Sequence, residues 1–463
     1  MSDDLANAWG CNLVEVDNKR KRGSATALLG DVSDKSEFSK LIASTIGTDF
    51  VLDKLTPNGS DANLYAITSL TEGDTNLCLV ACGSYVAGDK GPLQSWSTSG
   101  FSVKKGGPCA VLNPANVPSP FTRSHAIPLP YCIPGTMTDD DFERYEDRCL
   151  KFLHKRLLVA KMKGAAIKAI FLELMLGGNG AYLPASSLDK LGLMASHHGF
   201  QLIVDEIMTA GRCGEMIISP RMPDTFKSNI AYITMGKWLK CGLVLIGQRQ
   251  DYNLKLKTLD LPRRGTSTDL CHKEPMTYWK AVADNLHLTQ KRHEDVLRSL
   301  NLNSGDTWGG MLLIFASGRR QGIASGLLCR FLPKLTPTPI DRGIQVSEVE
   351  AWSKQNVNDD LVASMDLWCD KDLYCTNEDD EALYYLATSL GIMYEEGDAV
   401  QTSRIAQMMG GNEQYNERAV CRYCRMAEAA GLLEKVLKTE KRLNYWVIQA
   451  PMTLPFKSGV GQL

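Results

Sequence analysis

Three short apolar segments constrain the fold of this chain more than any other feature. They cover residues 169–175, 200–208 and 230–236, and each is a nearly continuous apolar run. Such runs are typical of strands that are buried on both faces of a parallel sheet. Residues 188–199, between the first two runs, resemble a helix that ends on Gly199 as its C-cap. The pattern predicts a right-handed crossover unit in a doubly wound α/β sheet.

The alternation of apolar runs and helical stretches extends from about Phe38 to Gly247. A chain of 463 residues is too long for one average domain, so further units are expected. From Lys273 to Leu335 helices and short strands mix, beginning with a helix from residue 275 to 300. Residues 336–378 are rich in Pro, Asn and Asp, which is typical of a linker.

The last hundred residues predict a different unit. Helices are expected over 379–397, 403–411 and 416–436, the third with Asn416 as N-cap and an end at Gly431. Two strands should follow, joined by a polar turn at residues 438–442. The order of helix, short helix, longer helix and hairpin resembles a winged helix-turn-helix domain.

Composition excludes several classes of protein. The formal net charge is −2, so no global field attracts polyanions. No apolar run approaches the length of a membrane span, and the polar N-terminus lacks a signal-peptide core, so a cytoplasmic protein without membrane contact is expected. The 14 cysteines are scattered and often lie in apolar runs, which favours buried thiols over disulfides. The basic run at residues 19–22 is interpreted as a solvated loop rather than a nuclear signal.

Two ionisable residues follow neighbouring strands of the predicted sheet. Asp205 ends the second apolar run, where ligands of open α/β sheets bind, and a buried carboxylate there needs a cationic partner. Lys237 follows the third run through Met235 and Gly236, which puts an amine at the same edge. A lysine after a glycine is usually just a solvated loop residue. With Asp205 upstream, the pair instead indicates a site in which a desolvated amine has a lowered pKa.

The residues around this pair carry a resemblance to a known family. LIVDEIMTAGRCGE (202–215) and PDTFKSNIAYITMGKWLKCGLVLIG (223–247) resemble, in order and spacing, two blocks of the class III aminotransferases of fold type I. That family combines a doubly wound, mostly parallel sheet with a small α+β domain. The resemblance implies that Lys237 binds pyridoxal 5′-phosphate (PLP) as a Schiff base, the aldimine. Asp205 would then hold a proton on the pyridine nitrogen, and Ile207 would lie against the cofactor.

A third block precedes these two. LTPNGSDANLYAITSLT (55–71) resembles the family's glycine turn, which opens a helix whose N-terminus binds the cofactor phosphate. The resemblance assigns Gly59 and Ser60 to this cradle, with Asp61 closing the first helical turn. Taken alone, these residues would be an ordinary helix start.

Two further blocks lie between the third block and Asp205. Residues 77–88 resemble the family's strand and following turn, whose aromatic residue stacks on the pyridine ring, a role that falls to Tyr85. The family's histidine is missing there, and an unrelated loop tyrosine is the alternative. Residues 171–184 resemble a glycine-rich block that gives Glu173 an acidic position near the active site.

The last two blocks concern the neighbouring subunit and the substrate. Residues 263–270 resemble a segment whose threonine reaches the phosphate across a dimer interface, which indicates Thr266, or Thr268 as the alternative. The Gly-Asn-Pro that follows in the family is absent. Residues 327–336 resemble a segment whose arginine binds the substrate carboxylate, which assigns Arg330 to substrate binding.

The resemblance implies an aminotransferase that moves an amino group from an amino acid or ω-amine to a keto acid or aldehyde, as a homodimer with active sites at the interface. Decarboxylation, aminomutase, epimerase or carbon–carbon bond-forming chemistry on the same cofactor is the first alternative. A transcription regulator that senses PLP or an amino acid and uses its winged helix is the second. Fused regulators of that kind usually carry the DNA-binding domain at the N-terminus, which argues against it.

Other side-chain groups are weighed against simpler interpretations. Cys421 and Cys424 lie within a predicted helix rather than a zinc knuckle, and no metal site is expected. His197 and His198 are interpreted as surface or packing residues. Three arginines, at positions 418, 422 and 425, fall on one helix face, as in a DNA-reading helix. From Asp398 to Gln449, however, eight basic residues oppose six acidic ones, and this small surplus favours a docking module over DNA binding.

These interpretations divide the chain into six parts. The expected ranges are 1–45 for an N-terminal segment of the small domain, 46–272 for the PLP-binding large domain, 273–340 for the small domain, 341–377 for the linker, 378–450 for the winged-helix-like domain and 451–463 for the tail.

Overall fold

A computed structural model describes two well-packed parts of the chain, one on each side of the expected linker. The described residues are 32–81, 84, 86, 126–131, 139–175, 183–207, 209–211, 215–217, 219, 222–236, 239, 241–248, 275–284, 286, 378–410, 415–438, 443–450 and 454–455.

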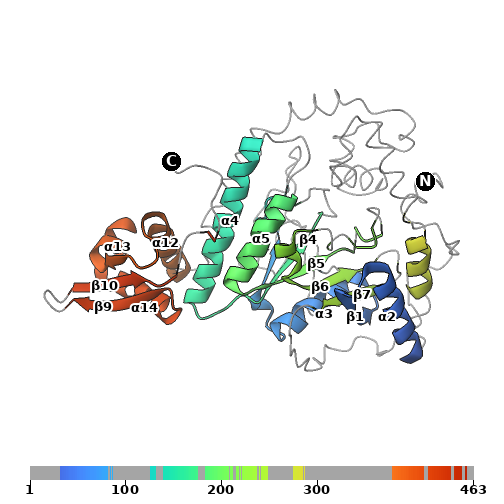
Figure 1. The fold of residues 1–463 in the computed structure, drawn as a ribbon. Coiled ribbons are helices and arrows are strands. Elements are labelled where there is room, and N and C mark those ends of the chain that lie inside the picture. Colours follow the sequence, from blue (N-terminus) through green and yellow to red (C-terminus); the bar gives the residue numbers. More distant parts are fainter. Residues whose placement is uncertain are drawn as a thin grey trace.

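A seven-stranded sheet forms the centre of the first part (Figure 1). Its strand order is β1-β7-β6-β5-β4-β2-β3, in which β7 runs antiparallel to both of its neighbours and all other pairs are parallel. The strands are β1 (Phe50–Thr56), β2 (Cys78–Ala81), β3 (Ala126–Ile127), β4 (Ala169–Glu173), β5 (Gln201–Asp205), β6 (Ile230–Met235) and β7 (Gly242–Gly247). The predicted α/β class with a mostly parallel sheet is confirmed.

The central strands are buried on both faces, as their apolar runs predict. Every residue of β4 and of β6 is buried. Successive side chains of β4 alternate between two hydrophobic clusters: Ile170 and Leu172 belong to one, and Ala169 and Phe171 to the other. A strand with an apolar core on each side therefore needs apolar residues at every position.

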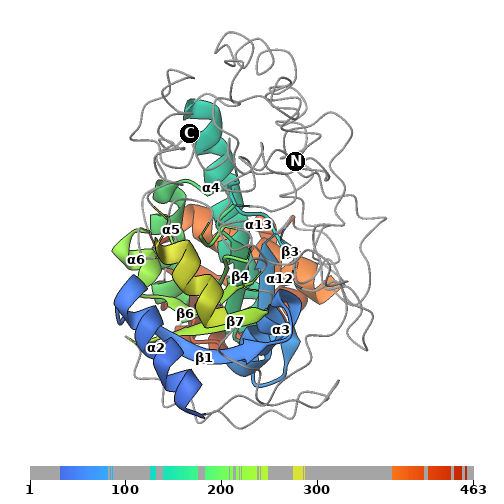
Figure 2. The same ribbon diagram turned by 90° about the vertical axis from the view of Figure 1, so that its right-hand side faces the viewer.

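Helices supply both of these cores. The helix α3 (Gly59–Thr71) packs on one face. The helices α4 (Asp139–Met162) and α5 (Ala185–His198) pack on the other. The helix α2 (Val32–Ile46) lies beside β1 at one end of the sheet (Figure 2). Gly199 ends α5 with a φ of 75°, so the predicted C-cap is confirmed.

Short elements complete this part. The 3-10 helix η1 (Thr75–Leu77) leads into β2, and α6 (Asp224–Lys227) leads into β6. Residues 275–284 are helical, at the start of the helix that the sequence predicts. None of the helices in the described ranges combines the length and apolar character that a membrane crossing requires.

The C-terminal part contains the predicted order of helices and hairpin. Its helices are α12 (Glu378–Met393), α13 (Thr402–Met408) and α14 (Glu417–Ala429), and its hairpin pairs β9 (Leu433–Lys438) with β10 (Leu443–Ile448). An additional short strand, β8 (Ala399–Gln401), pairs with the other side of β10. The α14 helix is shorter than its predicted range, because the chain turns at Gly431 with a φ of 69°.

The C-terminal part packs against the end of α4. Leu158, Val159 and Met162 of α4 belong to the same hydrophobic cluster as the buried residues of α12, α13 and α14. At this contact Lys163 Nζ lies 2.5 Å from Asp380 Oδ1, and the side chain of Asp380 is only 4% exposed. The two parts therefore share apolar surface as well as a partly buried ion pair.

Candidate active site

Three polar residues lie side by side where the central parallel strands end. Glu173 ends β4, Asp205 ends β5, and Thr234 lies near the end of β6; Asp205 is the register partner of both of the others. All three are buried, with exposed fractions of 4%, 5% and 0%. Polar residues that are buried directly after apolar runs mark the carboxyl edge of an open α/β sheet as the candidate site.

The Asp205 carboxylate is held by hydrogen bonds on both oxygens. Oδ2 accepts from Nδ2 of Asn63 at 2.9 Å. Oδ1 accepts from the backbone N–H of Ile207 at 2.7 Å. Hydrogen bonds donated to a carboxylate favour its charged form and fix its orientation.

Asn63 of α3 connects the elements around this carboxylate. Its Nδ2 also donates to the carbonyl oxygen of Val86 at 3.0 Å, and its Oδ1 accepts from the Thr234 hydroxyl at 2.6 Å. Sequence reasoning missed both Asn63 and Thr234. The available signal was an amide on the apolar face of α3, since Asn63 is fully buried between Ala62 and Ala66.

The N-terminus of α3 faces the same edge of the sheet. Asn58 caps the helix: its Oδ1 accepts from the Asp61 N–H at 2.9 Å, and its Nδ2 donates to the Asp61 carboxylate at 2.9 Å. Asp61 therefore closes the first turn, as the sequence predicts. Gly59 and Ser60 come just before Asp61 in the chain. Their backbone N–H groups have no hydrogen-bond acceptor among the described residues. They add to the partial positive charge of the helix terminus.

Gly59 lies in direct contact with the turns that follow β5 and β6. A Cβ atom at Gly59 would lie 2.5 Å from Cδ1 of Ile207. A Cβ atom at Gly236 would lie 3.5 Å from Cα of Gly59 and 3.6 Å from Cγ2 of Ile207. The residue before Lys237 is thus packed against the start of α3 and against the turn after Asp205.

Two neighbouring contacts stabilise this edge. The Tyr131 hydroxyl donates to the Glu173 carbonyl oxygen at 2.6 Å. The Glu206 carboxylate, which is fully buried, accepts from the Ser219 N–H at 2.9 Å and from the Ser219 hydroxyl at 2.5 Å. Glu206 therefore holds the segment after β5 in place, a role that the sequence did not indicate.

The structure brings together the predicted residues Asp205, Gly59, Ser60, Asp61 and Ile207, with Glu173 beside them on β4. The others lie outside the described residues, and their assignments stay predictions: Lys237, Tyr85, Thr266 with its alternative Thr268, and Arg330.

A second polar cluster lies between α4 and α5, away from this edge. Nδ1 of His154 and Nε2 of His198 are 2.9 Å apart, and the His197 ring packs edge-on against the His198 ring. Burial lowers the pKa of His198 to about 3, and the charges of His154, His197 and Lys161 act in the same direction. The packing role predicted for His198 agrees with this environment. Among the described residues no group of His, Cys, Asp and Glu is arranged to hold a metal ion.

Comparisons with known proteins give structural matches only. No family model matches the sequence, and no curated protein matches it. An aminotransferase from Bacillus anthracis aligns at 16% identity over 64% of this chain and 66% of its own, with a TM-score of 0.42. A transaminase from the marine bacterium Virgibacillus aligns at 15% identity over 64% of each chain, with a TM-score of 0.42. Lysine aminotransferase from M. tuberculosis aligns at 14% identity over 57% of this chain and 62% of its own, with a TM-score of 0.40.

Proposed function

We propose that this chain is a PLP-dependent aminotransferase of the class III type. It would move an amino group from an amino acid or ω-amine to a keto acid or aldehyde. The observation that carries the proposal is the meeting of three features at one sheet edge. These are the buried Asp205 carboxylate, the N-terminus of α3 and Gly236, the residue before Lys237. The ordered sequence blocks around these residues add independent support.

The described residues offer the two charges that such a cofactor requires, a carboxylate for the pyridine nitrogen and a helix N-terminus for the phosphate. Gly59 and Asn63 are four residues apart on α3, about 6 Å along the helix axis, and Asn63 holds Asp205. The helix N-terminus at Gly59 and the carboxylate of Asp205 are therefore joined through one turn of α3 and the Asn63 side chain. When bound, the cofactor supplies an electron sink for the carbanion formed at the substrate carbon.

Each residue at this edge has a definite task in the proposed site. The amides of Gly59 and Ser60 would bind phosphate oxygens at the start of α3. Asp205, oriented by Asn63 and the Ile207 N–H, would keep a pyridine nitrogen protonated. The Lys237 amine would carry the cofactor and then move a proton at the substrate carbon.

The remaining assignments rest on the sequence resemblance. Tyr85 would stack on the ring, Glu173 would supply an acidic group nearby, and Arg330 would bind a substrate carboxylate. Thr266 would reach the phosphate of a second subunit, which requires a homodimer. We place the protein in the cytoplasm, with the large domain at 46–272.

The C-terminal part is proposed to be a winged helix-turn-helix domain. The order α12, β8, α13, α14, β9, β10 and the three-stranded sheet β8-β10-β9 support this interpretation. Its elements contribute no described residue to the edge around Asp205, so we separate its role from the proposed chemistry.

A spectroscopic screen tests the proposed function. Protein loaded with PLP is mixed with a panel of amino acids and ω-amines, and the cofactor absorption is followed together with release of the keto acid or aldehyde. Transamination predicts one keto or aldehyde product per amine consumed, regeneration by a keto acid, and no turnover by a Lys237→Ala variant. Release of CO2, or a rearranged product that keeps its nitrogen, would instead support other PLP chemistry. Absence of any spectral change with every amine would contradict the proposal.

A further inference from the structure

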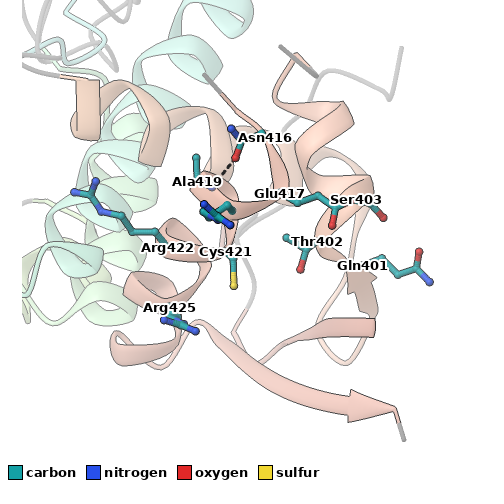
Figure 3. A pocket seen from close by; sticks show the side chains of 10 residues that line it. Gln401, Thr402, Ser403, Asn416, Glu417, Ala419, Cys421, Arg422 and Arg425 are labelled. Atoms are coloured by element: carbon teal, nitrogen blue, oxygen red, sulfur yellow. Dashed lines mark hydrogen bonds between the residues drawn. The ribbon is translucent and has the colours of Figure 1, made fainter. Parts of the chain in front are cut away.

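A polar groove lies in the C-terminal part, between the start of α13 and the exposed face of α14 (Figure 3). Its volume is about 820 Å³. The residues that line it are Gln401, Thr402, Ser403, Asn416, Glu417, Arg418, Ala419, Cys421, Arg422 and Arg425. The proposed amino-group chemistry uses none of these residues.

Arginine dominates the charge of this groove. Arg418, Arg422 and Arg425 are all exposed, and Glu417 is the one acidic residue among the lining residues that the structure describes. Arg422 forms an ion pair with Asp379 at 2.8 Å. Arg418 and Arg425 have no carboxylate partner among the described residues, so both guanidinium groups can accept an anionic ligand. Outside the groove, five basic and five acidic residues of the segment 398–449 balance, so the whole surplus of that segment belongs to the groove residues.

The lining also indicates what kind of partner the groove suits. Protein interfaces rely on large apolar or aromatic anchors that fill pockets in the partner surface. Within the described part of the lining, only Ala419 and Cys421 are apolar. Guanidinium groups beside hydroxyl and amide groups suit phosphate oxygens, which accept paired N–H donors.

The spacing of the arginines favours a polymer of phosphates over a single phosphate. Arg418 and Arg425 are seven residues apart on α14, which is about 10 Å along the helix axis. The opposite face of α14 is buried through Val420, Tyr423 and Cys424, so the arginine face is turned outward. The elements α13, α14, β9 and β10 lie together at one end of the drawing in Figure 1, on the side away from the seven-stranded sheet.

We propose that α14 binds duplex DNA through Arg418 and Arg425, with the groove beside α13 holding the phosphate backbone. A DNA major groove is about 12 Å wide and admits an α-helix, whereas the deep and narrow major groove of duplex RNA does not. This inference is independent of the proposed enzyme chemistry, because it uses other residues and another part of the chain.

Salt-dependent binding tests this inference on the full chain. A fluorescein-labelled duplex of 20 base pairs is titrated with protein, and its anisotropy is measured between 50 and 200 mM KCl. Each lost phosphate contact lowers the slope of log K against log[salt] by about 0.9. The Arg418→Gln/Arg425→Gln variant should lose about 1.8 from that slope and bind about 60-fold more weakly at 0.1 M salt.

The matched control is Arg144→Gln, an exposed arginine on α4 outside the groove, which should leave slope and affinity unchanged. Circular dichroism checks that both variants fold, which is expected because the substituted side chains are exposed. Absence of DNA binding at 50 mM KCl, or an equal slope for wild type and double variant, would overturn the inference. Tighter binding of polyglutamate than of the duplex would overturn it as well, in favour of an acidic protein partner.

Discussion

Replacing Asn63 by alanine tests whether the hydrogen bonds around Asp205 serve the cofactor or only the fold. The substitution removes the bond to the Asp205 carboxylate and leaves the buried Thr234 hydroxyl without its acceptor. A hydrogen bond to a charged group contributes roughly 1.5–3 kcal/mol, and an unsatisfied buried group costs roughly 1–3 kcal/mol. We therefore expect the free energy of unfolding of the apoprotein to fall by about 3–5 kcal/mol.

The matched control is Asn229→Ala, because Asn229 is also a buried amide of the α/β part with three hydrogen bonds. Its Nδ2 donates to the Gly192 carbonyl, the Ser196 hydroxyl and the Thr225 carbonyl, none of which lies at the candidate site. Its loss should also destabilise the fold, by about 1–3 kcal/mol. It should leave the affinity for PLP unchanged.

The assay combines urea unfolding of the apoprotein with a PLP titration followed by absorption. Asn63→Ala should weaken PLP binding at least tenfold, which corresponds to about 1.4 kcal/mol. Asn229→Ala should not. Equal PLP affinities for the two variants, at measurable stability losses in both, would refute the assignment of Asn63 as the residue that orients Asp205.

Three further predictions concern stability. In Gly242→Ala the new Cβ would lie 2.1 Å from the carbonyl oxygen of Asn58, which belongs to the backbone and cannot easily move. This variant should lower the free energy of unfolding in urea by more than about 3 kcal/mol, and a change below about 1 kcal/mol would contradict the prediction. The pKa of His198 is lowered in the folded protein, so between about pH 3 and pH 6.5 its imidazole binds a proton in the unfolded state but not in the folded state. The free energy of unfolding should then fall by about 2 kcal/mol from pH 7 to pH 5, and His198→Gln should flatten this dependence in urea titrations at each pH. Thr402→Val leaves the buried Trp446 indole N–H without its acceptor, so the free energy of unfolding should fall by about 1–3 kcal/mol when unfolding is followed by fluorescence. Thr402→Ser keeps the hydroxyl and should retain most of the stability.

Local sequence signals predicted the regular elements well. The apolar runs predicted the buried strands β4, β5 and β6. Gly199 predicted the C-terminus of α5, and Asn416 predicted the N-terminus of α14. These signals work because burial on both faces and helix capping depend on neighbouring residues in the chain. The strand β8 was missed because three residues carry little periodicity, and its pairing depends on β10, more than forty residues later.

The candidate site was predicted only in part, for a related reason. Asp205 and the start of α3 carry recognisable local patterns. Asn63 reaches Asp205 and Thr234 across 142 and 171 residues, so no local pattern links them. Glu206 was missed as well, because a carboxylate beside Asp205 gains its role only from Ser219, 13 residues away.

The most direct test of the proposed function asks where PLP becomes attached to the chain. Protein purified with excess PLP is reduced with borohydride, digested and analysed by mass spectrometry. We expect a phosphopyridoxyl group on the peptide that contains Lys237, and no such group in the Lys237→Ala variant. A colourless protein without this modification, or a modification confined to other lysines, would contradict the account.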